Sequence, residues 1–151
     1  MRRVLLGAAA LLLGIQLVPV ARTGRPGPVD PVEAPAEVAE ALRVACHDCH
    51  SQATVWPWYS RVAPVSWLVA HDVVEGREHL DFSTWNTLGP RRKTKLLGKI
   101  AEDVEEGEMP PALYRLAHPE ARLADATRRA IITWARDKER STTPIPSPAG
   151  R

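Results

Sequence analysis

Cysteine is nearly absent from this chain of 151 residues, which contains only Cys46 and Cys49. So few cysteines exclude a scaffold stapled by several disulfides. Acidic residues are missing before Asp30, and Arg2 and Arg3 carry the formal net charge of +2. The remaining basic and acidic side chains balance, which argues against a nucleic-acid-binding surface because such a surface needs a net basic face.

Alternating polar and apolar runs that would form β-strands are also lacking, and apolar residues recur at helical spacing. The spacing predicts four helices: a short one marked by Val38, Leu42 and Ala45, and longer ones over 64–79, 90–106 and 123–138. The predicted core face of the second helix consists of Val65, Leu68, Val69, Val73 and Gly76. Ala124 stands where a capping Ser or Asp is usual, so the last helix should fray at its first turn. The sequence therefore predicts an all-α fold, a small bundle of about four short helices.

Residues 46–50 read Cys-His-Asp-Cys-His, the C-x-x-C-H motif that attaches a c-type haem. Two thiols add to two vinyl groups of one porphyrin, so the cysteines must lie about one helical turn apart, as Cys46 and Cys49 do in sequence. His50 follows where its imidazole can supply an axial nitrogen to the iron. The motif predicts one covalently attached haem c, held by Cys46, Cys49 and His50, at the centre of the helical bundle.

Residues 1–21 are predicted to lie outside the folded domain. Arg2 and Arg3 precede an uncharged stretch, Val4 to Ala21, which is typical of a secretory signal or a membrane anchor. Pro19 occupies the −3 position of a cleavage site after Ala21, and this favours an uncleaved, single-pass signal anchor. The globular part would then lie on the periplasmic side of the cell membrane. Covalent haem attachment also takes place outside the cytoplasm, so anchor and motif support each other.

The rest of the chain divides by composition. Residues 22–36 contain four prolines and two glycines and are predicted to form an extended tether. Residues 141–151 are rich in proline, serine and threonine and are predicted to be a disordered tail. The haem-binding domain is therefore expected at 37–140.

Met109 is the one methionine besides Met1, and two prolines follow it in a loop before the last predicted helix. A thioether is a common sixth ligand of electron-transfer haems, and the prolines stiffen the loop. These features predict Met109 as the second iron ligand, in an order of elements that resembles class I cytochromes c. Two alternatives stay open: Met109 is an ordinary core residue, or His71 on the second helix is the ligand.

Aromatic residues concentrate after the motif, at Trp56, Trp58, Tyr59, Trp67 and Trp85. They are expected either to wall the haem pocket or to fill the core. The runs around them, Trp56-Pro57-Trp58-Tyr59-Ser60, Ala63-Pro64-Val65-Ser66-Trp67 and Glu75-Gly76-Arg77, together with C-x-x-C-H and Gly107-Glu108-Met109-Pro110, resemble the bacterial haem-binding domain family. That family consists of small, exported, single-haem c-type proteins. The resemblance covers about 15–138 and implies haem on Cys46 and Cys49 with His50 as proximal ligand.

These features predict a membrane-anchored monohaem cytochrome that passes single electrons to redox partner proteins and is not an enzyme. Ligation by both His50 and Met109 would leave no open iron position for a substrate, which favours electron transfer. Three alternatives remain: a haem-based sensor or small-ligand binder, a haem peroxidase or an accessory domain of one, and a zinc or thiol-redox module. The His adjacent to the second cysteine, the export signal and the Met109 loop weigh against the last.

Overall fold

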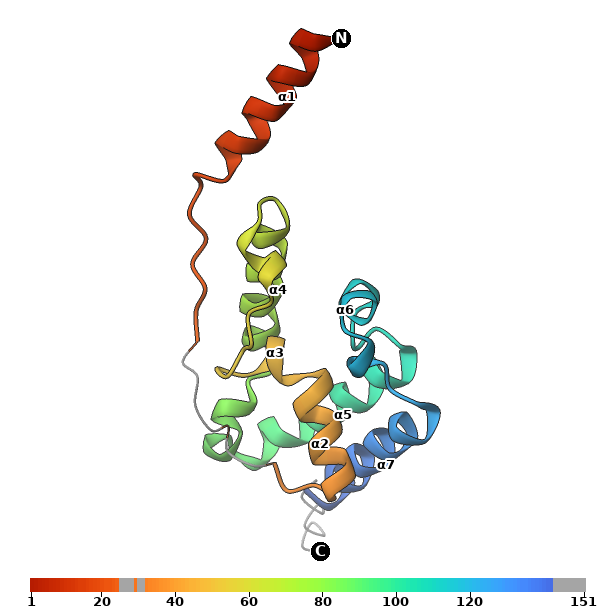
Figure 1. The fold of residues 1–151 in the computed structure, drawn as a ribbon. Coiled ribbons are helices and arrows are strands. Elements are labelled where there is room, and N and C mark those ends of the chain that lie inside the picture. The colour runs from red at the N-terminus through yellow and green to blue at the C-terminus, as the bar shows by residue number, and fades with distance from the viewer. Residues whose placement is uncertain (25–28, 30–31, 143–151) are drawn as a thin grey trace, which may run out of the picture.

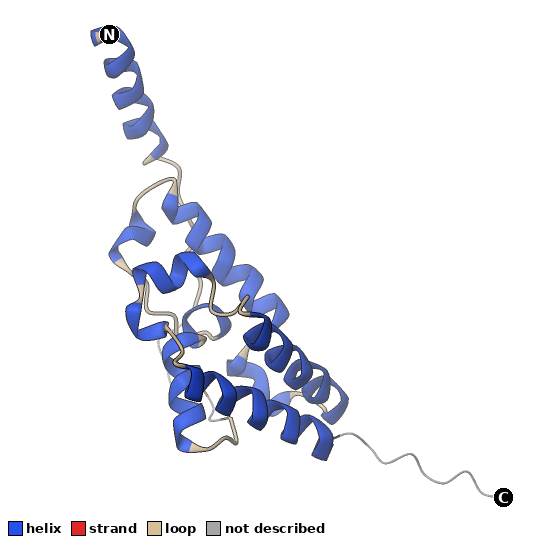
Figure 2. Cartoon of the chain, turned by 90° about the vertical axis from the view of Figure 1, so that its right-hand side faces the viewer, coloured by secondary structure: helices blue, strands red, loops and turns tan. Residues whose placement is uncertain are grey.

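The computed structural model describes residues 1–24, 29 and 32–142. Its elements are α1 (Arg2–Ile15), α2 (Ala36–Ala45), α3 (His47–His50), η1 (Trp58–Arg61), α4 (Val65–His79), η2 (Phe82–Thr87), α5 (Pro90–Glu106), α6 (Ala112–Ala117), η3 (Pro119–Ala121) and α7 (Asp125–Thr142), where η marks a 3-10 helix. The described residues contain no strand (Figure 2), so the predicted all-α fold is confirmed. Most of the predicted tail at 141–151, and part of the predicted tether at 22–36, lie outside the described residues.

The hydrophobic core lies between α2, α5 and α7, at the end of the molecule opposite to α1 (Figure 1). The predicted apolar face of α5 is buried as expected, through Leu96, Leu97, Ile100 and Val104. Ile131 and Trp134 of α7 pack into the same cluster, and so do Val38 and Leu42 of α2. Each such large side chain contributes about 1.5–3 kcal/mol relative to an exposed one. Burial of these apolar side chains therefore stabilises this part of the fold.

The ends of α5 follow from its sequence. Pro90 opens the helix at a position where its missing N–H costs nothing, and Gly89 precedes it. Gly107 ends it with a φ of +78°, in the left-handed region that favours glycine. The chain reverses there into the loop that carries Met109, so the predicted boundaries at 90 and 106 are confirmed.

α4 differs from the prediction in the side that it buries. Its buried residues are Ser66, Ala70 and Val73, whereas Val65 and Leu68 of the predicted core face are exposed. Small side chains face the core because α4 lies close against α3 and η1. Large apolar residues occur all round this helix, so their spacing alone could not indicate which side faces inward.

Two further differences lie near the C-terminus. α7 begins at Asp125, two residues after the predicted start, in keeping with the missing cap at Ala124. The short helix α6 was not predicted, because six residues are too few to show a helical period.

The N-terminal helix α1 projects from the domain and buries none of its residues (Figure 1). It ends at Ile15, where the side chain of Gln16 turns back to the carbonyl of Leu12. The helix is thus shorter than the predicted anchor at 4–21. Nowhere in the described residues is a helix long and apolar enough to cross a membrane.

Candidate haem site

The two cysteines lie at the single helical turn α3: Cys46 precedes this turn and Cys49 is part of it. Cys46 ends α2 and begins α3, and its carbonyl accepts the N–H of His50 at 2.9 Å. Both Cys46 and Cys49 are free thiols. Cys46 also packs against the core, which fixes the turn to the α2–α5–α7 cluster. The structure therefore brings Cys46, Cys49 and His50 together at the spacing that the sequence predicts.

The imidazole of His50 is oriented by two backbone carbonyls. Its Nδ1 lies 2.8 Å from Gly76 O and 3.0 Å from Leu80 O, at the C-terminal end of α4. Both partners only accept hydrogen bonds, so Nδ1 carries the proton and Nε2 keeps its lone pair. Burial lowers the pKa of His50 and outweighs the opposite effect of the two carbonyls. His50 is thus a neutral, oriented imidazole, the form that binds a metal.

The two thiols are shielded from ionisation. Burial raises the pKa of Cys46 to about 12 and that of Cys49 to about 11, and the charges of Asp48 and Asp72 add to the effect on Cys49. Thiol-redox and zinc sites need thiolates and have lowered cysteine pKa values. In the part of the chain that the structure describes, no three His, Cys, Asp or Glu side chains gather as a metal site.

Helix α4 contacts the motif at a glycine. A Cβ atom on Gly76 would lie 2.9 Å from Cys49 O, closer than real Cβ atoms come, and 3.2 Å from Cys49 Cβ, which is also tight. Glycine therefore permits the carbonyl of Gly76 to reach His50 while α4 touches the motif. The helical spacing placed Gly76 on a buried face but gave no sign of this role.

A hydrogen-bonded cluster that the sequence did not reveal holds the other side of the motif. Asp48, between the two cysteines, accepts the hydroxyl of Tyr114 at 2.8 Å and the N–H of Val55 at 3.0 Å. Tyr114 of α6 stacks on His118 at 4.3 Å, and His118 Nε2 lies 2.7 Å from the hydroxyl of Tyr59. Burial raises the pKa of Tyr114, and the neighbouring charge of Asp48 raises it further. Helix α6 is thereby fixed beside the motif.

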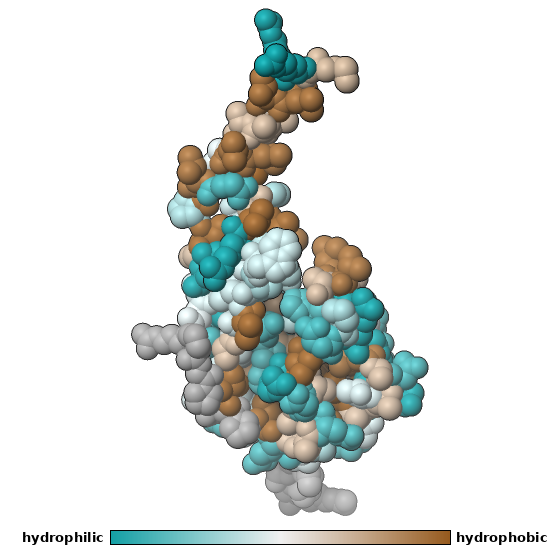
Figure 3. All heavy atoms as spheres, in the orientation of Figure 1, coloured by the Kyte–Doolittle hydropathy of each residue, from teal (hydrophilic) through white to brown (hydrophobic). Residues whose placement is uncertain are grey.

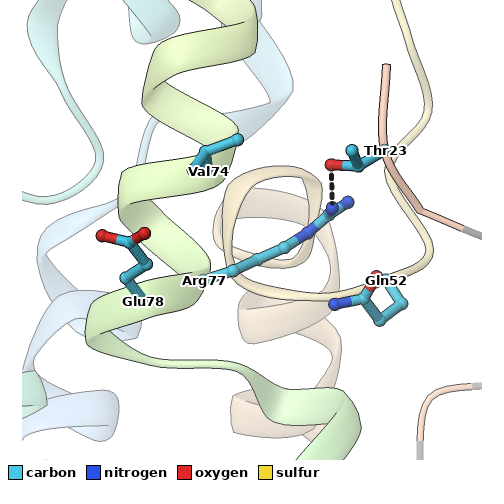
Figure 4. A pocket seen from close by; sticks show the side chains of 5 residues that line it. All are labelled: Thr23, Gln52, Val74, Arg77 and Glu78. Carbon is cyan, nitrogen blue, oxygen red and sulfur yellow. Dashed lines mark hydrogen bonds between the residues drawn. The ribbon is translucent and has the colours of Figure 1, made fainter. Parts of the chain in front are cut away.

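Arg77 braces the segment that follows the motif and also bonds to Thr23 in the N-terminal segment, the contact that Figure 4 shows. Its guanidinium donates to Ser51 O at 2.7 Å, to Thr54 Oγ1 at 2.7 Å and to Thr23 Oγ1 at 2.9 Å. One side chain thus joins α4, the chain after the motif and the N-terminal segment. A shallow pocket lies beside it, lined by Thr23, Gln52, Val74, Arg77 and Glu78.

The predicted sixth ligand lies in the turn after α5. Met109 is half-buried against the core, and its N–H donates to Asp103 O at 3.1 Å. Cys46 of the motif packs against the same core cluster as Met109. His71, the alternative ligand, has a side chain that is 70% exposed and lies 3.5 Å from Glu75. Ligation by Met109 stays a prediction.

The surroundings of the motif suit a haem. α4 and α6 both contact the motif, and both expose large apolar side chains: Leu68, Val74, Leu113 and Leu116. In Figure 3, hydrophobic residues (brown) lie at the surface of the domain among hydrophilic ones (teal). A porphyrin covers apolar surface when it binds, and α4 and α6 both offer such surface. Of the five aromatic residues after the motif, only Trp85 is buried in the core.

Comparison with known proteins agrees with this geometry. The family described as "Haem-binding domain" matches residues 10–137, a range that runs from the end of α1 into α7. No curated protein and no solved structure gives a significant match. The family match covers most of the chain and contains the whole of the site. The chain therefore belongs to the haem-binding domain family.

Proposed function

We propose that the chain is a c-type cytochrome that carries single electrons on the outer side of the cytoplasmic membrane. Cys46 and Cys49 attach one haem, and His50 and Met109 ligate its iron. The observation that carries the proposal is the imidazole of His50, held at Nδ1 by Gly76 O and Leu80 O beside two free thiols. When bound, the haem supplies an iron that accepts and releases one electron.

The thioether bonds need no oxidant. The S–H group of each cysteine would add across one vinyl group of the haem, with sulfur bonding to one carbon and the hydrogen going to the other. The helical turn between Cys46 and Cys49 supports this step, because two thiols about one turn apart could reach the two vinyl groups of one porphyrin. Raised thiol pKa values keep both groups protonated and unpaired before attachment.

Electron transfer without catalysis is proposed because two protein ligands would occupy both axial positions. Met109 lies in the loop after Gly107, and both Met109 and Cys46 pack against the core cluster, which supports this ligand set. Redox partner proteins and attachment to the membrane through α1 belong to the same proposal. The exposed apolar surface of α1 supports that attachment.

The test is a pyridine haemochrome spectrum of protein made in a bacterium that attaches c-type haems, after extraction with acidic acetone. We expect the haem to stay on the chain and to give a c-type spectrum. The Cys46→Ala/Cys49→Ala variant should lose its haem to the solvent. As a matched control, His47→Ala should retain it, because His47 lies in the same motif but contacts Phe82, at 5.1 Å between rings. Haem extracted from the unchanged protein would contradict covalent attachment.

A further inference from the structure

The segment after α1 is fixed to the haem domain instead of hanging free. Gln16 Nε2 donates to Ala63 O at 3.0 Å, and Ala63 N donates to Gln16 Oε1 at 2.9 Å. Arg22 donates to Ser60 O at 3.2 Å, and Thr23 Oγ1 accepts from Arg77 at 2.9 Å. These contacts hold the end of α1 against η1 and the start of α4, as Figure 1 shows. The direction of α1 relative to the domain is therefore set.

Large apolar side chains are exposed at this same end of the domain. We call them the Trp58 patch: Trp58, Val62, Val65 and Trp67. Trp58 is 77% exposed, which is unusual for the side chain with the largest apolar area. The patch starts in η1 and continues into the first turn of α4, directly beside Ala63, to which Gln16 bonds. It therefore extends the apolar surface of α1.

The chain segments that carry the patch and the end of α1 have charged side chains of one sign only. Residues 1–29 and 49–71 contain no Asp or Glu, although the chain has 18 of them. Arg22 and Arg61 lie in these two segments. The carboxylate that approaches from α6 and η3, Glu120, is paired with His118 at 2.8 Å, and His118 contacts Tyr59. Exposed tryptophan with arginine and without free carboxylates is the composition that lipid interfaces favour.

We infer that the Trp58 patch is a lipid-contacting surface, turned toward the bilayer by the bonds of Gln16, Arg22 and Thr23. The inference rests on the proposed attachment of α1 to a membrane and adds the orientation of the domain to it. Arg77 bonds both to Thr23 and to the segment after the motif, so the same contacts set the position of the haem site relative to the lipid surface.

The experiment uses the full chain with haem attached, in which Cys46 and Cys49 are consumed and cannot be labelled. A nitroxide is placed at Val62→Cys, and at Arg129→Cys on the exposed side of α7 as control. The protein is floated with vesicles of phosphatidylcholine and phosphatidylglycerol. Collisions of the label with oxygen, which enters lipid, and with a water-soluble nickel chelate are compared. We expect oxygen to dominate at Val62→Cys, nickel to dominate at Arg129→Cys, and Gln16→Ala to shift the Val62→Cys label toward nickel.

Two results would overturn the inference in different ways. If the protein floats but the Val62→Cys label collides mainly with nickel, membrane attachment stands and the proposed orientation is wrong. Protein that does not float at all rejects both the attachment and the orientation. If Val62→Cys does not fold, a label at Trp58→Cys reports on the same surface, because that side chain is far more exposed.

Discussion

Individual residues of the motif are held by partners from distant parts of the chain. His50 is oriented from α4, and Asp48 is held by Tyr114 of α6. These bonds come from the protein's own groups, so they orient the imidazole for ligation of iron. Met109, the proposed sixth ligand of the iron, lies in the turn after α5.

The substitution Met109→Leu tests that ligand with little loss of volume. Because leucine keeps the packing against the core and lacks sulfur, we expect the protein to fold, to change its absorption spectrum and to lower its reduction potential by on the order of 0.1 V. A redox titration followed optically measures both. His71→Ala is the control, and it should leave both quantities unchanged. An unaltered spectrum in Met109→Leu would exclude the thioether, and rapid CO binding by the unchanged protein would favour a haem sensor.

At the scale of elements, the close contact of α4 with α3 is the feature most sensitive to volume. Gly76→Ala adds a methyl group within 3 Å of the Cys49 backbone, which cannot give way as a flexible side chain can. We expect a loss of about 1–3 kcal/mol in the free energy of unfolding, despite a gain in helix propensity of up to about 1 kcal/mol. Thermal unfolding of the haem-loaded protein and its haem content measure the effect.

Gly98→Ala on α5 is the matched control for Gly76→Ala. Its added methyl group would meet only the end of the Glu139 side chain, which can move aside. The control should therefore be as stable as the unchanged protein or more stable. Equal stability of the two variants would show that the contact between α4 and Cys49 is looser than the structure has it.

The sequence predicted correctly those elements whose bounds depend on neighbouring residues in the chain. The apolar stripe of α5 and its glycine stop gave correct bounds, because both depend on local chemistry. The buried side of α4 was predicted only in part: Val73 is buried as expected, whereas Val65 and Leu68 are exposed. Which side faces inward depends on where Gly76 and Ala70 meet other segments. Cys46, Cys49 and His50 were found together because their spacing is local. Tyr114 and Arg77 were missed as supports of the site, because their partners are 66 and 26 residues away.

At the scale of the whole molecule, we expect two regions to depend on the haem to different degrees. The α2–α5–α7 cluster buries its apolar residues within the protein, whereas α4 and α6 leave large apolar side chains exposed. A region with few buried apolar contacts opens more readily than one with many. Removal of the haem should therefore loosen one part of the domain before the other.

Hydrogen exchange of haem-free protein, made without the attachment machinery, measures this difference. We expect amides of α5 and α7 to stay protected, and those of α4 and α6 to exchange more than about tenfold faster than in the haem-loaded protein. The reason is that α5 and α7 pack on each other along their length, while α4 meets the domain mainly through α3 and η1. Equal loss of protection in all four helices would mean that the α2–α5–α7 cluster also needs the haem to fold.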